Sequence, residues 1–294
     1  MNQRWLLTGG TGQVGLALRR NPPSGVEIVA PPRAELDLAN LPPLDLSGFA
    51  AIINCGAYTA VDQAESEPTL AHAVNARAPG RLAKVARQAG IPIIHVSTDY
   101  VFPADGKSPW HEYDSTGPVS VYGRTKLAGE QAIRDSGARH AIIRTAWVIS
   151  ADGHNFAKTM LRLGAERDSL RVVADQCGTP TSASDLAAAL VRVTNQFTGN
   201  PEQPSGIWHC ANHGETTWFG LANEIFACAE GRGLRVPRTV EAIATSAYPT
   251  PARRPRDSRL NCNRIAGDFG ISLRPWQDAV DEIVAELARQ EQAA

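Results

Sequence analysis

Two residues four positions apart, Tyr122 and Lys126, have side chains that could carry out acid–base chemistry together. If they share a helix, both side chains lie on one face, one turn apart. A tyrosine hydroxyl has an ordinary pKa of about 10, which makes it a poor acid near neutral pH. A neighbouring ammonium would favour the phenolate and lower that pKa. The pair therefore predicts a general acid–base site, although a surface helix that exposes both side chains has the same spacing.

A glycine-rich segment at the start of the chain has the spacing of a nucleotide-binding turn. Trp5-Leu6-Leu7 reads as a buried strand, and glycines follow at positions 9, 12 and 15, where a helical run begins near Val14. Such glycines allow a tight turn, a close approach of a pyrophosphate to the backbone and close helix–strand packing. The N-terminus of the helix adds N–H groups and partial positive charge. The segment predicts dinucleotide binding, and an ordinary glycine-rich turn is the alternative.

The charge that follows the second predicted strand bears on the choice of cofactor. Residues 26–30 read as a strand that ends in Pro31-Pro32-Arg33. An acidic residue there would bind the ribose 2′-hydroxyl of NAD, whereas an arginine suits the 2′-phosphate of NADP. Arg33 therefore favours NADP (NADPH) and leaves NAD (NADH) as the alternative, unless Arg33 is only a solvated loop residue. Asp37 is expected beside the adenine.

Further apolar runs place polar residues at the ends of strands. Residues 51–57 and 91–97 each read as a buried strand, and the second run ends in Ser97-Thr98-Asp99. In a doubly wound sheet, residues just past the strands line the ligand crevice. Thr98 is therefore expected to hydrogen-bond a substrate oxygen, although a turn or a helix cap would use the same hydroxyl.

The order of the predicted elements indicates the fold class. Strand-like and helix-like segments alternate to about residue 150, which predicts an α/β fold with a Rossmann-like, doubly wound parallel sheet. The pattern then loosens, with a helix that Ser184 would cap and a proline-containing linker at 198–205. We expect two interleaved domains: an NAD(P)-binding domain of residues 1–148 and 168–203, and a smaller, mainly C-terminal substrate-binding domain of residues 149–167 and 204–294.

The bulk composition excludes several classes of function. The 294 residues carry a formal net charge of −1, which argues against nucleic acid or an anionic membrane as a partner. No apolar run approaches the roughly 20 residues that span a bilayer. The five cysteines are scattered without a Cys-x-x-Cys pair, so we expect reduced thiols rather than disulfides or a zinc site. With no signal-peptide pattern at the N-terminus, a cytoplasmic protein is expected.

Several longer motifs resemble one enzyme family over nearly the whole chain. They are residues 8–15, 57–65, 97–102, 121–126, 144–148, 155–158 and 254–258. With these motifs the chain resembles the extended short-chain dehydrogenase/reductase superfamily and, within it, the dTDP-4-dehydrorhamnose reductase family. The motifs Ala57-Tyr58-Thr59-Ala60-Val61-Asp62-Gln63-Ala64-Glu65 and Ser97-Thr98-Asp99-Tyr100-Val101-Phe102 separate this family from the wider superfamily.

The resemblance implies a reaction and roles for named residues. The reaction is reduction by NAD(P)H of the C4 keto group of dTDP-4-dehydro-L-rhamnose to dTDP-L-rhamnose, a nucleotide sugar used in cell-envelope polysaccharides. Tyr122 would be the general acid, and Lys126 would poise it and hold the nicotinamide ribose. Thr98 would donate a second hydrogen bond to the oxygen on which negative charge develops.

The resemblance, together with the strand ends, also implies two sets of binding residues. The cofactor-binding set is Gly9, Gly12, Gln13, Val14, Gly15, Arg33, Asp37, Leu38, Gly56, Ala57, Thr59, Tyr122 and Lys126. The substrate-binding set is Val61, Thr98, Asp99, Tyr100, Trp147 and Arg254. Two roles stay open for Arg254: contact with the substrate diphosphate, and a structural ion pair.

One departure from the family concerns metal. Some members bind Mg²⁺ between carboxylates at a dimer interface, and one of these carboxylates lies on the helix after the glycine turn. Leu16-Ala17-Leu18 occupies that place in this chain and offers no acid. Because Mg²⁺ prefers carboxylate and water oxygens, we predict no magnesium site and a monomer or weak homodimer.

Three alternative functions stay open. A nucleotide-sugar dehydratase or epimerase would share the fold, but dehydratases of this kind need an Asp-Glu pair after the threonine, and here Tyr100 follows Asp99. Another nucleotide-deoxysugar 4-ketoreductase would use the same residues. A relative that binds NADP as a non-catalytic regulatory subunit is the third, and the presence of Thr98, Tyr122 and Lys126 together favours an enzyme.

Overall fold

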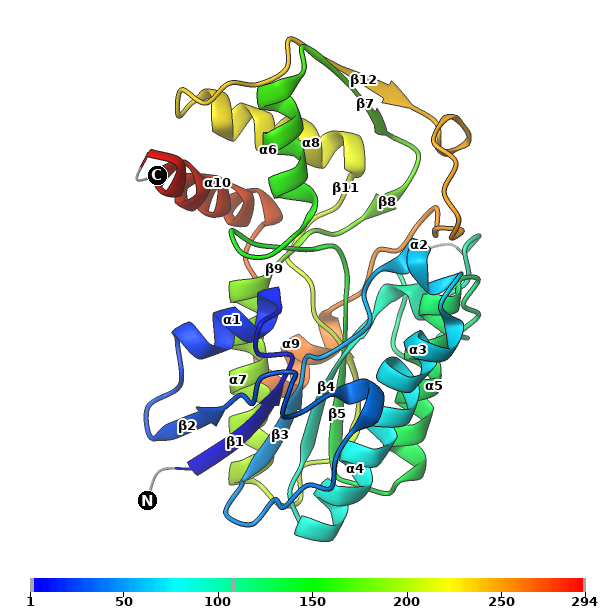
Figure 1. Ribbon diagram of the computed structural model, residues 1–294, viewed down its shortest axis with the longest axis vertical. Coiled ribbons are helices and arrows are strands. Elements are labelled where there is room, and N and C mark those ends of the chain that lie inside the picture. The colour runs from blue at the N-terminus through cyan, green and yellow to red at the C-terminus, as the bar shows by residue number, and fades with distance from the viewer. Residues whose placement is uncertain (1–2, 107–108, 293–294) are drawn as a thin grey trace.

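A six-stranded parallel sheet forms the larger part of the molecule (Figure 1). The computed structural model describes residues 3–106 and 109–292. The strand order is β10-β5-β4-β3-β1-β2, and each neighbouring pair is parallel. The bounds of these strands are β1 (Gln3–Thr8), β2 (Val26–Val29), β3 (Ala51–Asn54), β4 (Ile93–Thr98), β5 (His140–Thr145) and β10 (Gly206–His209).

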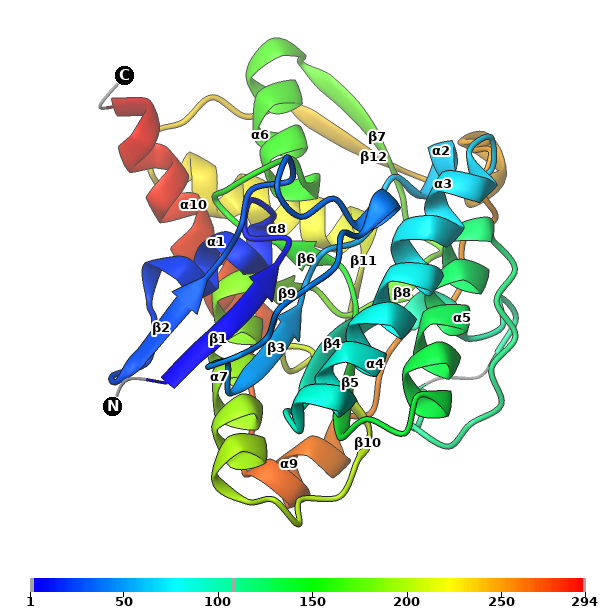
Figure 2. The same ribbon diagram turned by 60° about the horizontal axis from the view of Figure 1, so that its bottom comes forward.

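Helices cover both faces of this sheet (Figure 2), as the α/β expectation requires. Trp5 and Leu7 pack on one face with α1 (Gln13–Arg20), α7 (Ala183–Gly199) and α9 (Asn263–Phe269). Leu6 and Ile52 point the other way, toward α4 (Ala78–Ala89), and α5 (Val121–Asp135) completes that layer. Because both faces are covered, the strands are apolar nearly throughout. The Rossmann-like fold class is confirmed.

The helical segment over residues 71–89 is divided by a π-helical turn. It comprises the end of α3 (Pro68–His72), a π-helical turn η2 (Ala73–Arg77) and α4. The π turn packs closely on α5, since a Cβ atom at Gly129 would lie 2.1 Å from the Asn75 carbonyl oxygen. Such turns within α-helices often occur at functional sites. The remaining short elements of this part are η1 (Leu38–Asn40), α2 (Val61–Ala64) and η3 (Asp99–Val101).

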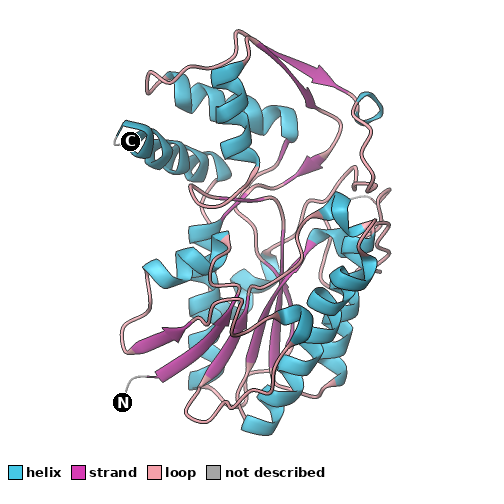
Figure 3. Cartoon of the chain, viewed as in Figure 1, coloured by secondary structure: helices cyan, strands magenta, loops and turns pink. Residues whose placement is uncertain are grey.

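A smaller part with its own apolar core lies beyond the carboxyl ends of the strands (Figure 3). Its helices are α6 (Phe156–Glu166), α8 (Trp218–Glu230) and α10 (Trp276–Gln292). Its strands are the parallel pair β7 (Ser169–Val173) and β12 (Thr239–Ile243), with β8 (Cys177–Gly178) beside β11 (Thr216–Thr217). The parallel pair β6 (Val148–Ile149) and β9 (Thr181–Ser182) lies between the two parts, and η4 (Thr245–Ala247) follows β12.

The division of the chain differs from the predicted one at three strands and one helix: β7 and β8 belong to the smaller part, and β10 and α9 belong to the larger part. β7, expected in the nucleotide-binding domain, pairs with β12 and packs Leu170 and Val172 into the smaller core. β10, expected in the substrate domain, is an edge strand of the large sheet. The stretch 198–205 therefore connects α7 to β10 within the larger part and is no interdomain linker. Ser182, rather than Ser184, caps α7 by accepting a hydrogen bond from the Asp185 N–H. Apolar patterning identifies strands but not their pairing partners.

Among residues 3–106 and 109–292, no helix is both long and apolar enough to cross a membrane. Within the same residues, no group of three or more His, Cys, Asp and Glu side chains is arranged to hold a metal ion.

Candidate active site

The carboxyl ends of β1, β3 and β4 lie side by side, and the predicted residues Gly9, Gly56 and Thr98 lie at or just past them. Thr8, Asn54 and His95 are neighbours across these strands, and Thr98 pairs with Thr145 at the end of β4. The chain leaves each strand toward the smaller part (Figure 1), so the following residues lie on the side of the sheet that faces that part. This is the place at which ligands bind in doubly wound sheets.

The glycine turn has the close packing that a dinucleotide-binding turn requires. Gly9 has a φ of +72°, and a Cβ atom there would lie 2.5 Å from the Gly56 nitrogen. A Cβ at Gly15 would lie 2.1 Å from the Gly9 oxygen. Gly12 begins α1 without a side-chain cap, which leaves N–H groups of the first turn available to a phosphate. The turn therefore fits a pyrophosphate, and the contact of Gln13 and Val14 with one stays a prediction.

The Gly15→Ala variant should weaken NADPH binding about 10-fold to 100-fold, because overpacking of this kind costs about 1–3 kcal/mol and displaces the turn. Fluorescence titration of the cofactor measures the effect. Gly199→Ala is the matched control, since a Cβ there meets no atom within 4 Å. An unchanged Kd in Gly15→Ala would argue against a phosphate at this turn.

The residues predicted for the adenosine end are close together. Leu38 packs against Gly56, where a Cβ atom would lie 2.4 Å from the leucine Cδ1. Arg33 is exposed and forms an ion pair with Asp37 over 3.5 Å, and Asp37 also accepts a hydrogen bond from the Ala39 N–H. Ala57 is half-buried and Thr59 exposed on the loop after β3. Their contact with a cofactor stays a prediction.

Tyr122 lies beside Thr98, as the sequence predicted. Ser120 caps α5 by accepting a hydrogen bond from the Gly123 N–H over 3.1 Å, and Tyr122 occupies the first turn. A Cβ at Gly123 would lie 2.3 Å from the Tyr100 oxygen, so glycine lets α5 approach η3. The rings of Tyr100 and Tyr122 meet edge to face with centroids 5.4 Å apart.

The expected lowering of the Tyr122 pKa by Lys126 is not found. Burial raises the pKa of the Tyr122 hydroxyl to about 12, although hydrogen bonding to Thr98 opposes the shift. The Lys126 Nζ instead donates to the Val96 carbonyl over 2.7 Å and lies 3.4 Å from the His95 Nε2. Burial also lowers the pKa of Lys126 to about 8. Tyr122 is therefore a neutral phenol with a proton to donate.

Asp99 is a buried carboxyl group next to the hydroxyls of Thr98 and Tyr122. Its side chain is 2% exposed, and burial raises its pKa to about 6 despite hydrogen bonds from Thr98 and Ser258. The Thr98 hydroxyl donates to the Asp99 Oδ1 over 2.8 Å and accepts from the Tyr100 N–H. Thr98 thus fills the capping role and also faces Tyr122.

The other predicted substrate residues are Trp147, Val61 and Arg254, and their contact with a substrate stays a prediction. Trp147 has a φ of +47°, packs on Gly178, and stacks on Trp218 with centroids 3.6 Å apart. Val61 begins α2, next to Asp62. Of the two roles considered for Arg254, the ion pair is present, with its Nη2 2.7 Å from the Asp62 Oδ2. The positive φ of Trp147 is a strained backbone conformation, which is typical of functional sites.

Several buried residues that hold the elements of the site together were not predicted from the sequence. Glu130, fully buried, pairs with Arg144 over 2.7 Å and accepts a hydrogen bond from Ser97. Asn75 bonds both backbone groups of Tyr58 and the Thr125 hydroxyl, which fixes the loop after β3 against α5. Glu130 and Arg144 are charged residues within otherwise apolar stretches, and this pattern could have predicted a buried ion pair. Nothing in the sequence singles out Asn75.

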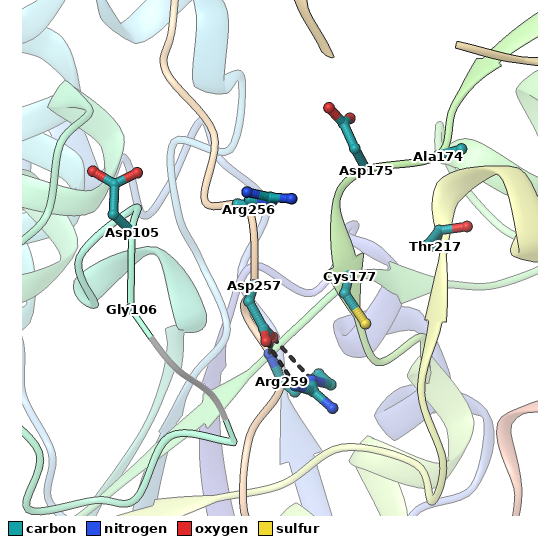
Figure 4. A pocket seen from close by; sticks show the side chains of 9 residues that line it. All are labelled: Asp105, Gly106, Ala174, Asp175, Cys177, Thr217, Arg256, Asp257 and Arg259. Atoms are coloured by element: carbon teal, nitrogen blue, oxygen red, sulfur yellow. Dashed lines mark hydrogen bonds and ion pairs between the residues drawn. The ribbon is translucent and has the colours of Figure 1, made fainter. Parts of the chain in front are cut away.

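A pocket of about 510 Å³ is lined by residues of the 256–259 segment together with Cys177 and Thr217 (Figure 4). Its charges are mixed. Arg259 forms ion pairs with Asp257 and Glu215, and Arg256 shares the pocket with Asp175 and Asp105. The pocket has no excess of positive charge for a polyphosphate, and none of the predicted site residues lines it.

Comparisons with known proteins agree on one family. The family model described as RmlD substrate binding domain matches residues 3–289. A dTDP-4-dehydrorhamnose reductase of Shigella flexneri is 42% identical, with 96% of this chain and 97% of that protein covered. The protein of that name from Escherichia coli strain K12 is 45% identical over 80% of this chain and 79% of its own length.

Solved structures lead to the same family. A dTDP-4-dehydrorhamnose reductase of Clostridium acetobutylicum superposes with a TM-score of 0.87 at 35% identity, covering 97% of this chain and 99% of that one. The enzyme of that name from Bacillus anthracis, in complex with NADP, gives 0.86 at 31% identity and covers 97% and 100%. With the glycine turn, the Thr98–Tyr122 pair and Lys126 in place, the chain belongs to the dTDP-4-dehydrorhamnose reductase family.

Proposed function

We propose that this protein reduces the C4 keto group of dTDP-4-dehydro-L-rhamnose to dTDP-L-rhamnose with NADPH. The main support for this proposal is that the Thr98 and Tyr122 hydroxyls lie next to each other at the carboxyl end of β4. The glycine turn lies at the same edge of the sheet. The Bacillus anthracis relative binds NADP, which supports the same cofactor here. A bound nicotinamide would supply the hydride.

The residues of the chain would handle the proton and the developing charge. Tyr122, held neutral by burial, would give its proton to the ketone oxygen as that oxygen gains charge. The Thr98 hydroxyl now donates to Asp99, and the substrate oxygen would take the place of Asp99 as its acceptor. Two donors aimed at one oxygen stabilise an oxyanion. Lys126 would hold the ribose, and Asp99, Tyr100, Val61 and Trp147 would surround the sugar.

Turnover with a defined product tests this proposal. The purified protein should consume NADPH only in the presence of dTDP-4-dehydro-L-rhamnose, and NMR of the product sugar gives the configuration at C4. Another C4 epimer, or another deoxysugar as the preferred substrate, would replace the proposed function by the related ketoreductase. NADPH binding without turnover on any such sugar would favour the regulatory subunit.

The cofactor preference should depend on Arg33. Hydrogen bonds to charged groups contribute about 1.5–3 kcal/mol, so Arg33→Ala should reduce the ratio of NADPH to NADH affinity at least about 10-fold. Titration with both cofactors measures the ratio. Arg4→Ala, which removes another exposed arginine on β1, is the control. A ratio that Arg33→Ala leaves unchanged would remove Arg33 from the cofactor site.

The assembly and compartment are also part of the proposal. We infer a monomer or weak homodimer, because α1 offers no acid for a metal-bridged interface. All five cysteines are free thiols, which suits a reducing, cytoplasmic compartment. Sedimentation with and without Mg²⁺ tests the assembly, and a magnesium-dependent dimer would contradict it.

A further inference from the structure

A chain of buried polar side chains links the glycine turn to Lys126. The Thr8 Oγ1 donates to the Asn54 Oδ1 over 2.5 Å, and the Asn54 Nδ2 lies 2.9 Å from the His95 Nδ1. The His95 Nε2 lies 3.4 Å from the Lys126 Nζ. The exposed fractions of these four side chains are 2%, 0%, 0% and 2% along the chain. A buried polar group without a hydrogen-bond partner destabilises the fold. Each donor in this network must therefore face an acceptor.

The direction of these hydrogen bonds fixes the proton of His95. The Thr8 hydroxyl already accepts from the Gly56 N–H, and it gives its own proton to the Asn54 oxygen. Asn54 must therefore turn its NH₂ group toward the His95 Nδ1, which acts as the acceptor. A neutral imidazole that accepts at one nitrogen carries its proton on the other. Burial, Lys126 and His140 lower the pKa of His95, which keeps the ring neutral.

The N–H group on the His95 Nε2 then faces Lys126. An ammonium has only donors, so it gains nothing from another N–H, whereas a neutral amine can accept that hydrogen bond. The Val96 carbonyl oxygen accepts from either form. Burial is the largest influence on the pKa of the lysine and disfavours the ammonium, whereas the titratable groups Glu130 and Cys55 favour it.

We propose that Thr8, Asn54 and His95 form a positioning relay for Lys126: they fix the His95 proton on Nε2, and that N–H group favours the neutral amine of Lys126 until a cofactor enters. Ribose hydroxyls and phosphates would then give the lysine acceptors and negative charge, and Lys126 would take up a proton. Gly56, which packs on Gly9 and binds Thr8, connects the relay to the turn. The role in catalysis rests on the proposed function, but the relay itself does not.

The tautomer of His95 is measured directly in the wild-type protein without a cofactor. Nitrogen-15 NMR distinguishes protonation at Nδ1 from protonation at Nε2, and the chain has seven histidines to resolve. His95→Gln identifies the signals of His95 by their loss. We expect the neutral ring with its proton on Nε2. A proton on Nδ1, or a charged ring at neutral pH, overturns the proposal.

The effect on Lys126 is measured by carbon-13 NMR of the lysine side chains. Only four lysines occur, Lys84, Lys107, Lys126 and Lys158, and Lys126→Arg assigns the signal. In the wild-type protein Lys126 should titrate with a pKa of about 8. In Asn54→Leu, the Nδ1 of His95 loses its donor, so the ring can take the other tautomer and accept from an ammonium. The pKa of Lys126 should then rise by about one unit, a tenfold change in proton affinity.

The sign of that shift separates the relay from simple burial. Asn54→Leu makes the interior more apolar, and burial alone would therefore lower the pKa of Lys126 or leave it unchanged. Either of those results overturns the proposal. Asn212→Leu, at an asparagine that is 3% exposed and bonds Asp185 instead, is the matched control. The His95 tautomer and the Lys126 pKa are measured without turnover. They therefore test the relay even if the proposed substrate is wrong.

Discussion

Tyr122→Phe should lower kcat about 10²-fold to 10⁴-fold, the range that positioned proton donors contribute. The variant keeps the ring that packs edge to face on Tyr100 and removes only the hydroxyl beside Thr98. The Kd for NADPH should change little, because binding depends on the glycine turn and Lys126. Steady-state turnover of the keto sugar and a separate cofactor titration measure the two quantities.

Tyr100→Phe is the matched control for this prediction. Tyr100 is the neighbouring tyrosine, its ring centroid lies 5.4 Å from that of Tyr122, and burial also raises its pKa. If Tyr122 is the acid, Tyr100→Phe should cost much less in kcat and act mainly on the KM for the sugar. The reverse order of effects would transfer the role to Tyr100. Full activity in Tyr122→Phe would leave the site without its proposed proton donor.

The local parts of this site could be predicted from the sequence because they depend on short-range spacing. The glycines at 9, 12 and 15 dictate a turn between a strand and a helix, and Tyr122 and Lys126 lie one helical turn apart wherever that helix is placed. Thr98 follows a run of apolar residues whose end had to reach the ligand edge of a parallel sheet. The turn before α1, the spacing of Tyr122 and Lys126 on α5 and the position of Thr98 at the end of β4 are present as predicted, while the contacts of these residues with ligands stay predictions.

The parts that failed depend on contacts between residues far apart in the chain. Lys126 was expected to act on Tyr122, but the nearest acceptor for its Nζ is the Val96 carbonyl on β4. β7 and β10 were assigned to the wrong cores, since a short apolar strand pairs equally well with several partners until the fold decides. His95 and Asn54 appeared only as members of apolar strands, and their register across β3 and β4 gives them a role.

The largest expected effect on stability comes from Glu130. Its carboxylate is fully buried, binds the guanidinium of Arg144 through two hydrogen bonds and accepts from the Ser97 hydroxyl. Removing one partner of a buried pair leaves an uncompensated charge, which costs about 3–5 kcal/mol of the free energy of unfolding. Glu130→Ala should therefore lower the unfolding midpoint strongly in a urea titration, and it should also lower the pKa of Lys126 further, since Glu130 favours the ammonium.

An exposed ion pair on another helix is the control for this loss in the free energy of unfolding. Glu166 on α6 pairs with Arg162 four residues earlier, and both side chains are more than half exposed. Glu166→Ala should cost less than about 0.5 kcal/mol, because water screens such pairs. A small loss in Glu130→Ala would mean that Arg144 reaches water when its partner is absent. A double variant, Glu130→Leu with Arg144→Met, should recover much of the lost stability, since replacing a whole buried pair by apolar residues leaves no charge behind.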